Sequence, residues 1–426
     1  MSSAPRALDA LRERDFRRFW IGAVVSNTGS WMQNAAIPYV AFDLTGSVAD
    51  IGVTGFFQYV PFMVMGLVGG GLADRFPRRA LLIGSQIAQA ACALTLYLMV
   101  STGAITTAWL SVLAFASGLA AGLNTPIWQA FVTELVPRDL LLNAVTLNSA
   151  QFNAARAVGP LLTGVIIATW GVSTTFLLNA VSFAVVIGVL LRITGRSDGT
   201  RRTVAGGALR GLGDAAKYVW ESPTIVACCT AIIAVAGFGS PLFSYLVVYG
   251  EDVLEVTGLQ LGVLFGAAGI GSVISTPVLL SVAPRLPRKL LLSGAMLGYG
   301  AAVVATGLAP NYATTVFALL FFGAAYLAIA STINTTIQLV VREELRGTVI
   351  AIYLACLTGA LPIGLLVWGQ VSERVGIRTT TVAAGSFLVV VTLVFIATGR
   401  FSVMAHADDA RDAAALPPIS GAVDEP

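Results

Sequence analysis

The amino-acid sequence predicts an all-α membrane protein with twelve transmembrane helices in two six-helix, pseudo-symmetric bundles. Three observations lead to this prediction: a very apolar composition, regularly spaced apolar runs, and a loop motif that occurs twice. Hydrophobic residues make up 56% of the 426-residue chain and charged residues 11%, whereas soluble domains have about 45–50% and about 25%. A soluble fold could not bury so much apolar surface, but a bilayer solvates it.

Twelve apolar runs reach the length of about 20 residues that crossing a bilayer requires. The fifth and tenth runs exceed one bilayer thickness, so we expect tilt or interfacial ends there. The predicted spans are 19–42, 51–73, 80–100, 108–132, 140–170 and 175–191 in the first half, and 225–249, 259–283, 290–308, 313–341, 349–371 and 380–397 in the second.

The basic residues predict the orientation. Of the 25 lysines and arginines, 22 fall in the head, the tail and alternate loops, Arg374 and Arg378 fall in the opposite loops, and Arg156 lies inside a span. Loops rich in Lys and Arg stay on the cytoplasmic side. We therefore expect a multi-pass protein of the cell (inner or plasma) membrane with both termini in the cytoplasm.

A twelve-residue segment repeats in the two halves. Residues 73–84 (ADRFPRRALLIG) align with residues 283–294 (APRLPRKLLLSG), and seven positions are identical. Such a repeat indicates two parallel six-helix units with a substrate site between them near the membrane midplane. The predicted parts are a cytoplasmic head (1–18), a first bundle (19–191), a linker carrying an interfacial helix (192–222), a second bundle (223–399) and a disordered cytoplasmic tail (400–426).

Catalytic and nucleotide-binding chemistry is excluded by residue type. The single histidine, His406, is in the tail, and no phosphate-binding loop sequence is present. The four cysteines lie in apolar runs without a CxxC pair, so we read them as small hydrophobes and expect no metal site. Basic residues form no stripe with interleaved aromatics, which excludes nucleic acid as a partner. We expect no cofactor and no enzymatic activity.

Residues 70–79 (GGLADRFPRR) resemble the loop between helices two and three that marks the major facilitator superfamily. The usual glycine is Pro77 here, and the second copy has Pro284 in place of the acid. A carboxylate at Asp74 can face the positive N-terminus of the helix that starts near Gly347. We expect a breakable latch formed by Asp74 with Arg75, Arg78, Arg79 and Arg138. The alternative is an ordinary positive-inside loop with an incidental acid.

The fifth span contains Gly159-Pro160 followed by Gly164, which looks like the fifth-helix motif of facilitator antiporters. Pro160 removes a backbone hydrogen bond, so a kink is expected. Together with Arg156 and the head segment 15–32, this motif resembles the enterobactin-exporter-like branch, which implies efflux of hydrophobic or siderophore-like compounds. Arg156 is expected to face an aqueous cavity as a counter-charge for substrate or gate. Its alternative role is structural, bonding carbonyls freed by the proline.

Polar residues share helix faces in several spans. The resemblance makes helices one, four, seven and ten cavity-lining, whereas the alternative role of these residues is hydrogen bonding between helices. The predicted cavity residues are Asn27, Trp31, Asn34, Asn124, Trp128, Asn153, Arg156, Asn334 and Gln338.

The function expected from these features is export of a small amphipathic molecule by proton antiport. No acid lies at the centre of a span, so Asp43 and Glu134, at opposite membrane edges, are the nearest candidate proton carriers. One alternative is a uniporter or importer of a neutral or anionic metabolite, and another is a scaffold or sensor that transports nothing. We expect a monomer whose partners are the bilayer, a small-molecule substrate and protons.

Overall fold

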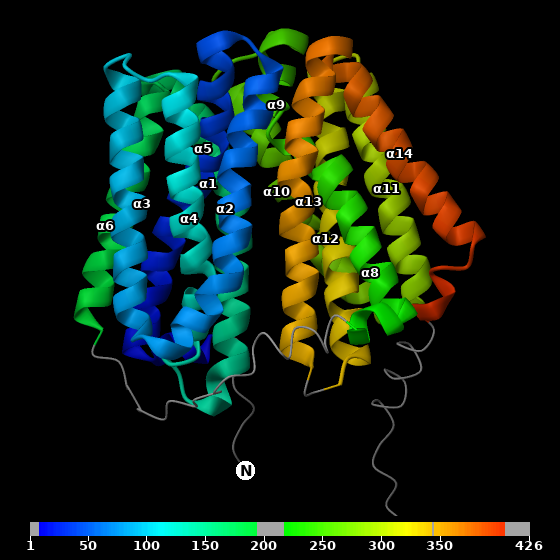
Figure 1. The fold of residues 1–426 in the computed structure, drawn as a ribbon, viewed down its shortest axis with the longest axis horizontal. Coiled ribbons are helices and arrows are strands. Elements are labelled where there is room, and N and C mark those ends of the chain that lie inside the picture. Colours follow the sequence, from blue (N-terminus) through cyan, green and yellow to red (C-terminus); the bar gives the residue numbers. More distant parts are fainter. Residues whose placement is uncertain (1–7, 194–216, 343–344, 405–426) are drawn as a thin grey trace, which may run out of the picture.

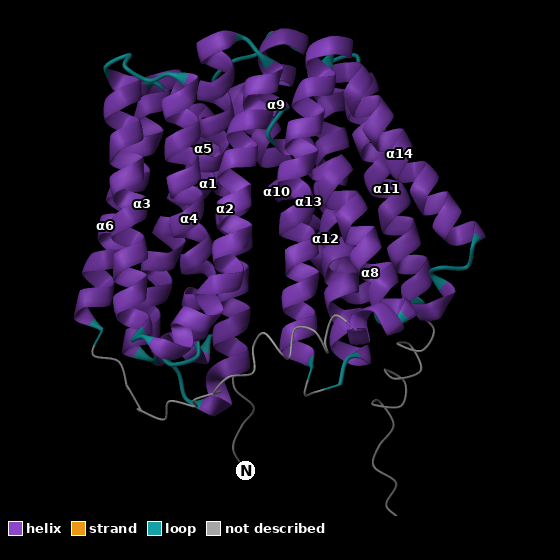
Figure 2. Cartoon of the chain, in the orientation of Figure 1, coloured by secondary structure: helices purple, strands orange, loops and turns teal. Residues whose placement is uncertain are grey.

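The computed structural model describes residues 8–193, 217–342 and 345–404, which form helices packed side by side in two groups (Figure 1). Figure 2 shows helix throughout this part of the chain, with loops at the two ends of the helices. The first group contains α1 (Arg14–Thr45), α2 (Val48–Arg75), α3 (Arg78–Ser101), α4 (Thr107–Val132), α5 (Leu141–Trp170) and α6 (Val172–Arg192).

The second group contains one broken helix and five continuous ones. The broken helix consists of α8 (Pro223–Ala234), the π-helical η3 (Val235–Gly239), η4 (Ser240–Phe243), α9 (Leu246–Val248) and the π-helical η5 (Tyr249–Val253). The continuous helices are α10 (Leu259–Val282), α11 (Arg288–Leu308), α12 (Tyr312–Val340), α13 (Arg346–Val375) and α14 (Ile377–Ala397).

The predicted fold class is confirmed. Within the described residues, eleven helical stretches are long and apolar enough to cross a membrane. The remaining helix of the first bundle, α1, is 32 residues long and packs against α5 and α6. It begins at Arg14, before the predicted start at Phe19, because residues 14–18 of the expected head are already helical. The greater part of the predicted linker helix and the predicted disordered tail lie outside the described residues.

The sequence repeat is also a repeat of local geometry. Pro77 and Pro287 are the N-caps of α3 and α11, and each accepts backbone hydrogen bonds from the residues three and four positions later at 3.0 and 3.1 Å. Gly171 and Gly376 join the last two helices of each bundle with φ of 82° and 85°, values that favour glycine. The two halves therefore use the same turns at matching places.

The two bundles meet along α2 with α13 and along α5 with α10. Gly164 lies against the backbone of Gly262, and Gly269 against that of Ala157, so a side chain at either glycine would collide with the facing helix. The contacts of α5 with α10 lie between the midpoints of these helices and the end that carries the loops after α1, α3 and α5. We call this end the outer end, following the predicted orientation; it is uppermost in Figure 1.

Candidate functional site

A polar pocket of about 300 Å³ lies in the first bundle. Its wall includes the predicted residues Asn27, Trp31, Asn34 and Asn124. Each asparagine also bonds a neighbour: Asn27 donates to Gln151 at 3.0 Å, Asn34 accepts from Gln58 at 3.0 Å, and Asn124 accepts from Ser85 at 2.9 Å. The three asparagines therefore line this pocket and also join neighbouring helices, and their role in a substrate cavity stays a prediction.

Arg156 lies at the midpoint of α5 and contacts both bundles. Its guanidinium carbon is 5.6 Å from the ring centre of Trp31 on α1 and 4.6 Å from that of Tyr326 on α12. Among the described residues, no carboxylate forms an ion pair with it. Trp31 also lines the polar pocket, so one side chain contacts both the pocket and Arg156. A half-buried cation between two rings suits an anionic or electronegative group attached to an apolar molecule.

Further aromatic side chains pack against Trp31, one of the two rings that contact this arginine. The Trp31 ring lies edge-on to Phe152 of α5, with ring centres 5.8 Å apart, and to Phe243 of η4, at 6.3 Å. Phe243 in turn lies 5.9 Å from Phe265 of α10. The aromatic cluster formed by Trp31, Phe152, Phe243 and Phe265 therefore joins the bundles at the level of Arg156.

Two predicted cavity residues of the first bundle lie apart from the polar pocket. Trp128 is 8% exposed, packs its ring 4.3 Å from that of Phe19, and donates to Asn148 at 3.2 Å, so it belongs to the packed core. Asn153 is exposed one turn from Arg156 and donates back to the carbonyl of Ser149 at 2.9 Å.

The tenth predicted span, α12, carries an exposed polar face between its midpoint and its inner end. Ser331, Asn334, Thr335 and Gln338 are all exposed, and Gln338 donates to Asn334 at 3.0 Å. Lipid contact would leave these groups in hydrocarbon, whereas a water-filled space satisfies them. This face therefore fits the predicted cavity, although neither Asn334 nor Gln338 lines the polar pocket.

The predicted latch residues lie at the inner ends of α2 and α3 and, for Arg138, in the short turn that precedes α5. The side chain of Asp74 is outside what the structure describes, so the latch stays a prediction. Arg78 forms an ion pair with Glu134 at 2.7 Å, and Arg79 donates to the carbonyls of Leu190 and Leu191 at 2.7 and 2.9 Å, capping α6. Arg75 and Arg138 are exposed.

Neither candidate proton carrier lines the polar pocket. Glu134 is tied to Arg78 at the inner end, and Asp43 is exposed near the outer end of α1. The structure therefore brings neither carboxylate to Arg156 or to the polar face of α12.

Gly159 sets how closely α5 approaches α1. A Cβ on Gly159 would lie 2.7 Å from that of Trp31 and 2.8 Å from the carbonyl oxygen of Thr28. One turn later, Thr163 donates to the carbonyl of Met32 at 3.1 Å. The helix assignment continues through Pro160, and the predicted kink remains a prediction. The glycine thus places Arg156 and Trp31 on closely packed helices.

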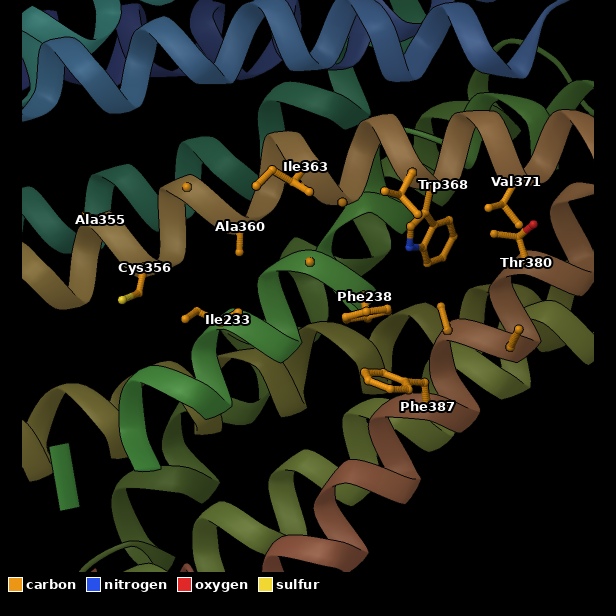
Figure 3. Close-up of a pocket in the computed structure, with 16 residues that line it drawn as sticks. Ile233, Phe238, Ala355, Cys356, Ala360, Ile363, Trp368, Val371, Thr380 and Phe387 are labelled. Carbon is orange, nitrogen blue, oxygen red and sulfur yellow. The ribbon is translucent and has the colours of Figure 1, made fainter. Parts of the chain in front are cut away.

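A second, apolar pocket of about 560 Å³ lies among α8, η3, α13 and α14 (Figure 3). Phe238 and Phe387, with ring centres 4.2 Å apart, lie below α13, and Trp368 extends from α13 toward them. Its wall also includes Ile363 and Val367, which are exposed on the surface of the bundle. None of the predicted cavity residues lines this pocket.

Sequence reasoning missed three features of this region. These are the roles of Tyr326 and Phe243 and the break in the α8–η5 segment. The contacts of Tyr326 and Phe243 become visible only when the chain is folded, because both residues are far from Arg156 in sequence. A local signal for the break was present: Gly237, Gly239 and Pro241 lie within five residues. Gly239 has no room for a side chain against the ring of Tyr299 on α11. Gly and Pro in such density favour an interrupted helix.

Comparison with known proteins identifies the family. A family profile described as transmembrane secretion effector matches residues 5–425. The chain belongs to this family of the major facilitator superfamily. It is therefore a multi-pass membrane transporter, as the resemblance of residues 70–79 implied, and the family is not one of enzymes.

Relatives and solved structures agree with this assignment. The multidrug efflux pump Tap of Mycolicibacterium fortuitum is 24% identical over 85% of this chain and 90% of its own. The staphyloferrin A transporter of Staphylococcus aureus is 23% identical over 86% of this chain and 92% of its own. The structure of a bacterial homolog of the human lysosomal transporter Spinster superposes with a TM-score of 0.74 at 15% identity, covering 93% of this chain and 98% of that one.

Proposed function

We propose that this facilitator exports small amphipathic organic molecules by alternating access, and that Arg156 with the polar pocket forms its substrate site. The observation that carries the proposal is the position of Arg156: midway along α5, between the ring of Tyr326 on α12 and the ring of Trp31 on α1, which lines the polar pocket. A site reached from both bundles changes its surroundings when the bundles rock against each other.

The substrate class follows from the chemistry of this site. The rings of Trp31 and Phe152 accept apolar or aromatic groups, the amides of Asn27 and Asn34 exchange hydrogen bonds, and Arg156 attracts negative charge. We therefore propose that an amphipathic compound with an anionic or strongly electronegative group is preferred. Relatives named as a multidrug efflux pump and a siderophore transporter support this class.

Export driven by proton antiport is the finer part of the proposal. It is supported by relatives named as efflux pumps, among them macrolide efflux protein A of Streptococcus pyogenes, 20% identical over 89% of this chain and 94% of its own. Import or uniport of a metabolite is the competing function, and the two differ in the direction of net movement.

Accumulation assays test the proposal. Cells expressing the wild-type chain should accumulate less of an anionic amphipathic dye than cells lacking it, and an uncoupler should abolish the difference. Arg156→Ala should raise the apparent KM for the anionic dye by about tenfold or more, since hydrogen bonds to charged groups are lost, while a neutral dye of similar size is affected less. Val367→Phe, which alters the wall of the apolar pocket, is the matched control and should leave the KM of the anionic dye unchanged.

Other outcomes would replace parts of the proposal. Higher accumulation in expressing cells would make the protein an importer. Efflux that persists after the proton gradient collapses would remove antiport and favour facilitated diffusion. Equal slowing of all compounds in Arg156→Ala would assign Arg156 to the gate instead of to substrate binding.

A further inference from the structure

The outer ends of α2 and α13 are joined by one carboxylate. Oε2 of Glu373, in the last turn of α13, accepts a hydrogen bond from the backbone N–H of Ala49 at 3.1 Å and another from the Ser47 hydroxyl at 3.2 Å. Ser47 is the N-cap of α2, and its own side chain makes no capping bond. Glu373 therefore supplies, from the other bundle, the oxygen acceptor that an N-cap side chain ordinarily supplies to the first turn of a helix.

The helices beneath this contact touch through their backbones. A Cβ on Gly52 would lie 2.6 Å from the carbonyl oxygen of Leu365, and one on Gly369 would lie 3.1 Å from Cα of Ala49. That same Leu365 carbonyl accepts a hydrogen bond from Tyr245 at 2.6 Å. The outer contact between α2 and α13, comprising 47–55 and 365–373, is thus a close seam with the Glu373 bonds at its outer limit.

We infer that Glu373 is a gating residue that holds the outer end closed by capping α2 and must release α2 when the outer end opens. A carboxylate at a helix N-terminus is stabilised by the unpaired N–H groups and by the helix dipole. Separation of α2 from α13 removes Glu373 from the N-terminus of α2. The closed state alone therefore contains this interaction, and its loss shifts the equilibrium toward the open state.

The inference rests on the proposed alternating-access transport, and it mirrors the predicted inner latch. There, Asp74 at the inner end of α2 is expected to face the N-terminus of α13. At the outer end, α13 supplies the acid and α2 supplies the N-terminus. The same pair of helices would then carry one helix-capping carboxylate at each end. Each carboxylate would stabilise the conformation in which its own end is closed.

Thiol labelling of the purified protein in detergent tests the gate without a substrate. Leu365 is fully buried in the seam, so Leu365→Cys should react with a bulky polar thiol reagent only when the seam opens. The reaction of the chain without this cysteine is subtracted as background. In the Leu365→Cys chain, Glu373→Gln should raise the labelling rate about two- to fivefold, the range expected for an exposed carboxylate at a helix N-terminus.

Asp50→Asn is the matched control. Asp50 also lies in the first turn of α2, but its Oδ2 accepts from Thr45 of the same bundle at 2.8 Å. Removing its charge should leave the labelling rate unchanged. Ser47→Ala removes a donor on the opposite side of the contact and should change the rate in the same direction as Glu373→Gln, which guards against a folding defect in one variant.

The outcomes separate the gate from the proposed function. An unchanged rate in Glu373→Gln and Ser47→Ala, or an equal rise in Asp50→Asn, would overturn the inference even if the wild-type chain transports. A rise confined to the two contact variants, in a chain that moves none of the tested compounds, would support the gate and remove the proposed transport function.

Discussion

The energetic position of Arg156 sets its chemical role. An arginine near the centre of a bilayer costs about 2.5–3.5 kcal/mol or more. The contacts with Trp31 and Tyr326 offset part of this, at about 0.5–2 kcal/mol each depending on solvation. The ring faces stabilise the positive charge of the guanidinium, but they do not accept hydrogen bonds from its N–H groups. Within the described residues no hydrogen bond to another residue occupies these donors, so they stay available to a ligand or to water.

At the inner end, Asp74→Asn tests the predicted latch. The substitution should slow transport several-fold while folding and membrane insertion are retained, because it weakens one conformational state and leaves the core intact. The assay is dye efflux normalised to the amount of protein in the membrane. Asp139→Asn is the comparison: it neutralises another exposed acid at the inner end, to which no role in the latch is assigned, and it should leave the rate unchanged. Wild-type rates in Asp74→Asn would reduce the loop to a topology signal.

Individual residues were predicted from sequence to the extent that their role was local. Arg156 was identifiable as the only charge near the middle of a span, and Asn27, Asn34 and Asn124 as polar residues on faces of apolar helices. The core position of Trp128 and the role inferred for Glu373 depend on neighbours distant in sequence, Phe19 and Ser47. No periodicity within one span reports such contacts.

Helix α5 shows how a glycine motif organises a whole element. Because Gly159 has no side chain, α1 can approach α5 closely, and Gly164 allows the same approach by α10 on another face. A single helix thus packs closely against one helix of its own bundle and one of the other bundle. Small residues allow such approaches in membranes, where packing and not hydrophobicity drives association. The broken α8–η5 segment uses its glycines similarly, since Gly237 lies against Gly364 of α13.

Gly164→Ala should therefore be far more harmful than an alanine elsewhere. Its methyl group would collide with the backbone of Gly262, which has no side chain to move aside. We expect a lower thermal unfolding midpoint or a more open outer end, and in both cases slower efflux. Gly84→Ala in α3 is the control, because nothing lies within 4 Å of the added methyl and alanine favours helix by about 1 kcal/mol. Equal behaviour of the two variants would refute the role given to Gly164.

At the scale of the molecule, the two bundles touch in their outer halves, while polar side chains of α5 and α12 are exposed in the inner halves. The approximate ends of the helices and the superfamily were predictable because each depends on local hydropathy or a short motif, whereas eleven of the twelve predicted spans meet the length and hydropathy of a membrane crossing within the described residues. Which end of the molecule is closed was not predictable from the sequence, since the conformations open at the outer and at the inner end consist of the same helices.

Reporter fusions test the predicted orientation. A fusion at Ser197 should score cytoplasmic and one at Pro310 external, because 22 of the 25 basic residues fall in the head, the tail and the loops predicted to share their side. A cytoplasmic marker such as green fluorescence and an external one such as alkaline phosphatase give opposite readings at each position. The reverse pattern would invert the meaning of outer and inner end throughout the molecule.

The matching turns at Pro77 and Pro287, and at Gly171 and Gly376, have a consequence for how such a chain could arise. Six crossings return a polypeptide to the face from which it started. A tandem copy of a six-helix unit therefore enters the bilayer with the orientation of the first, and its charge asymmetry needs no revision. With five or seven crossings, the second copy would be inverted, and its basic loops would lie on the opposite face of the membrane from those of the first copy. Because the number of crossings in the unit is even, a duplicated chain can insert in the correct orientation without any change to its loops.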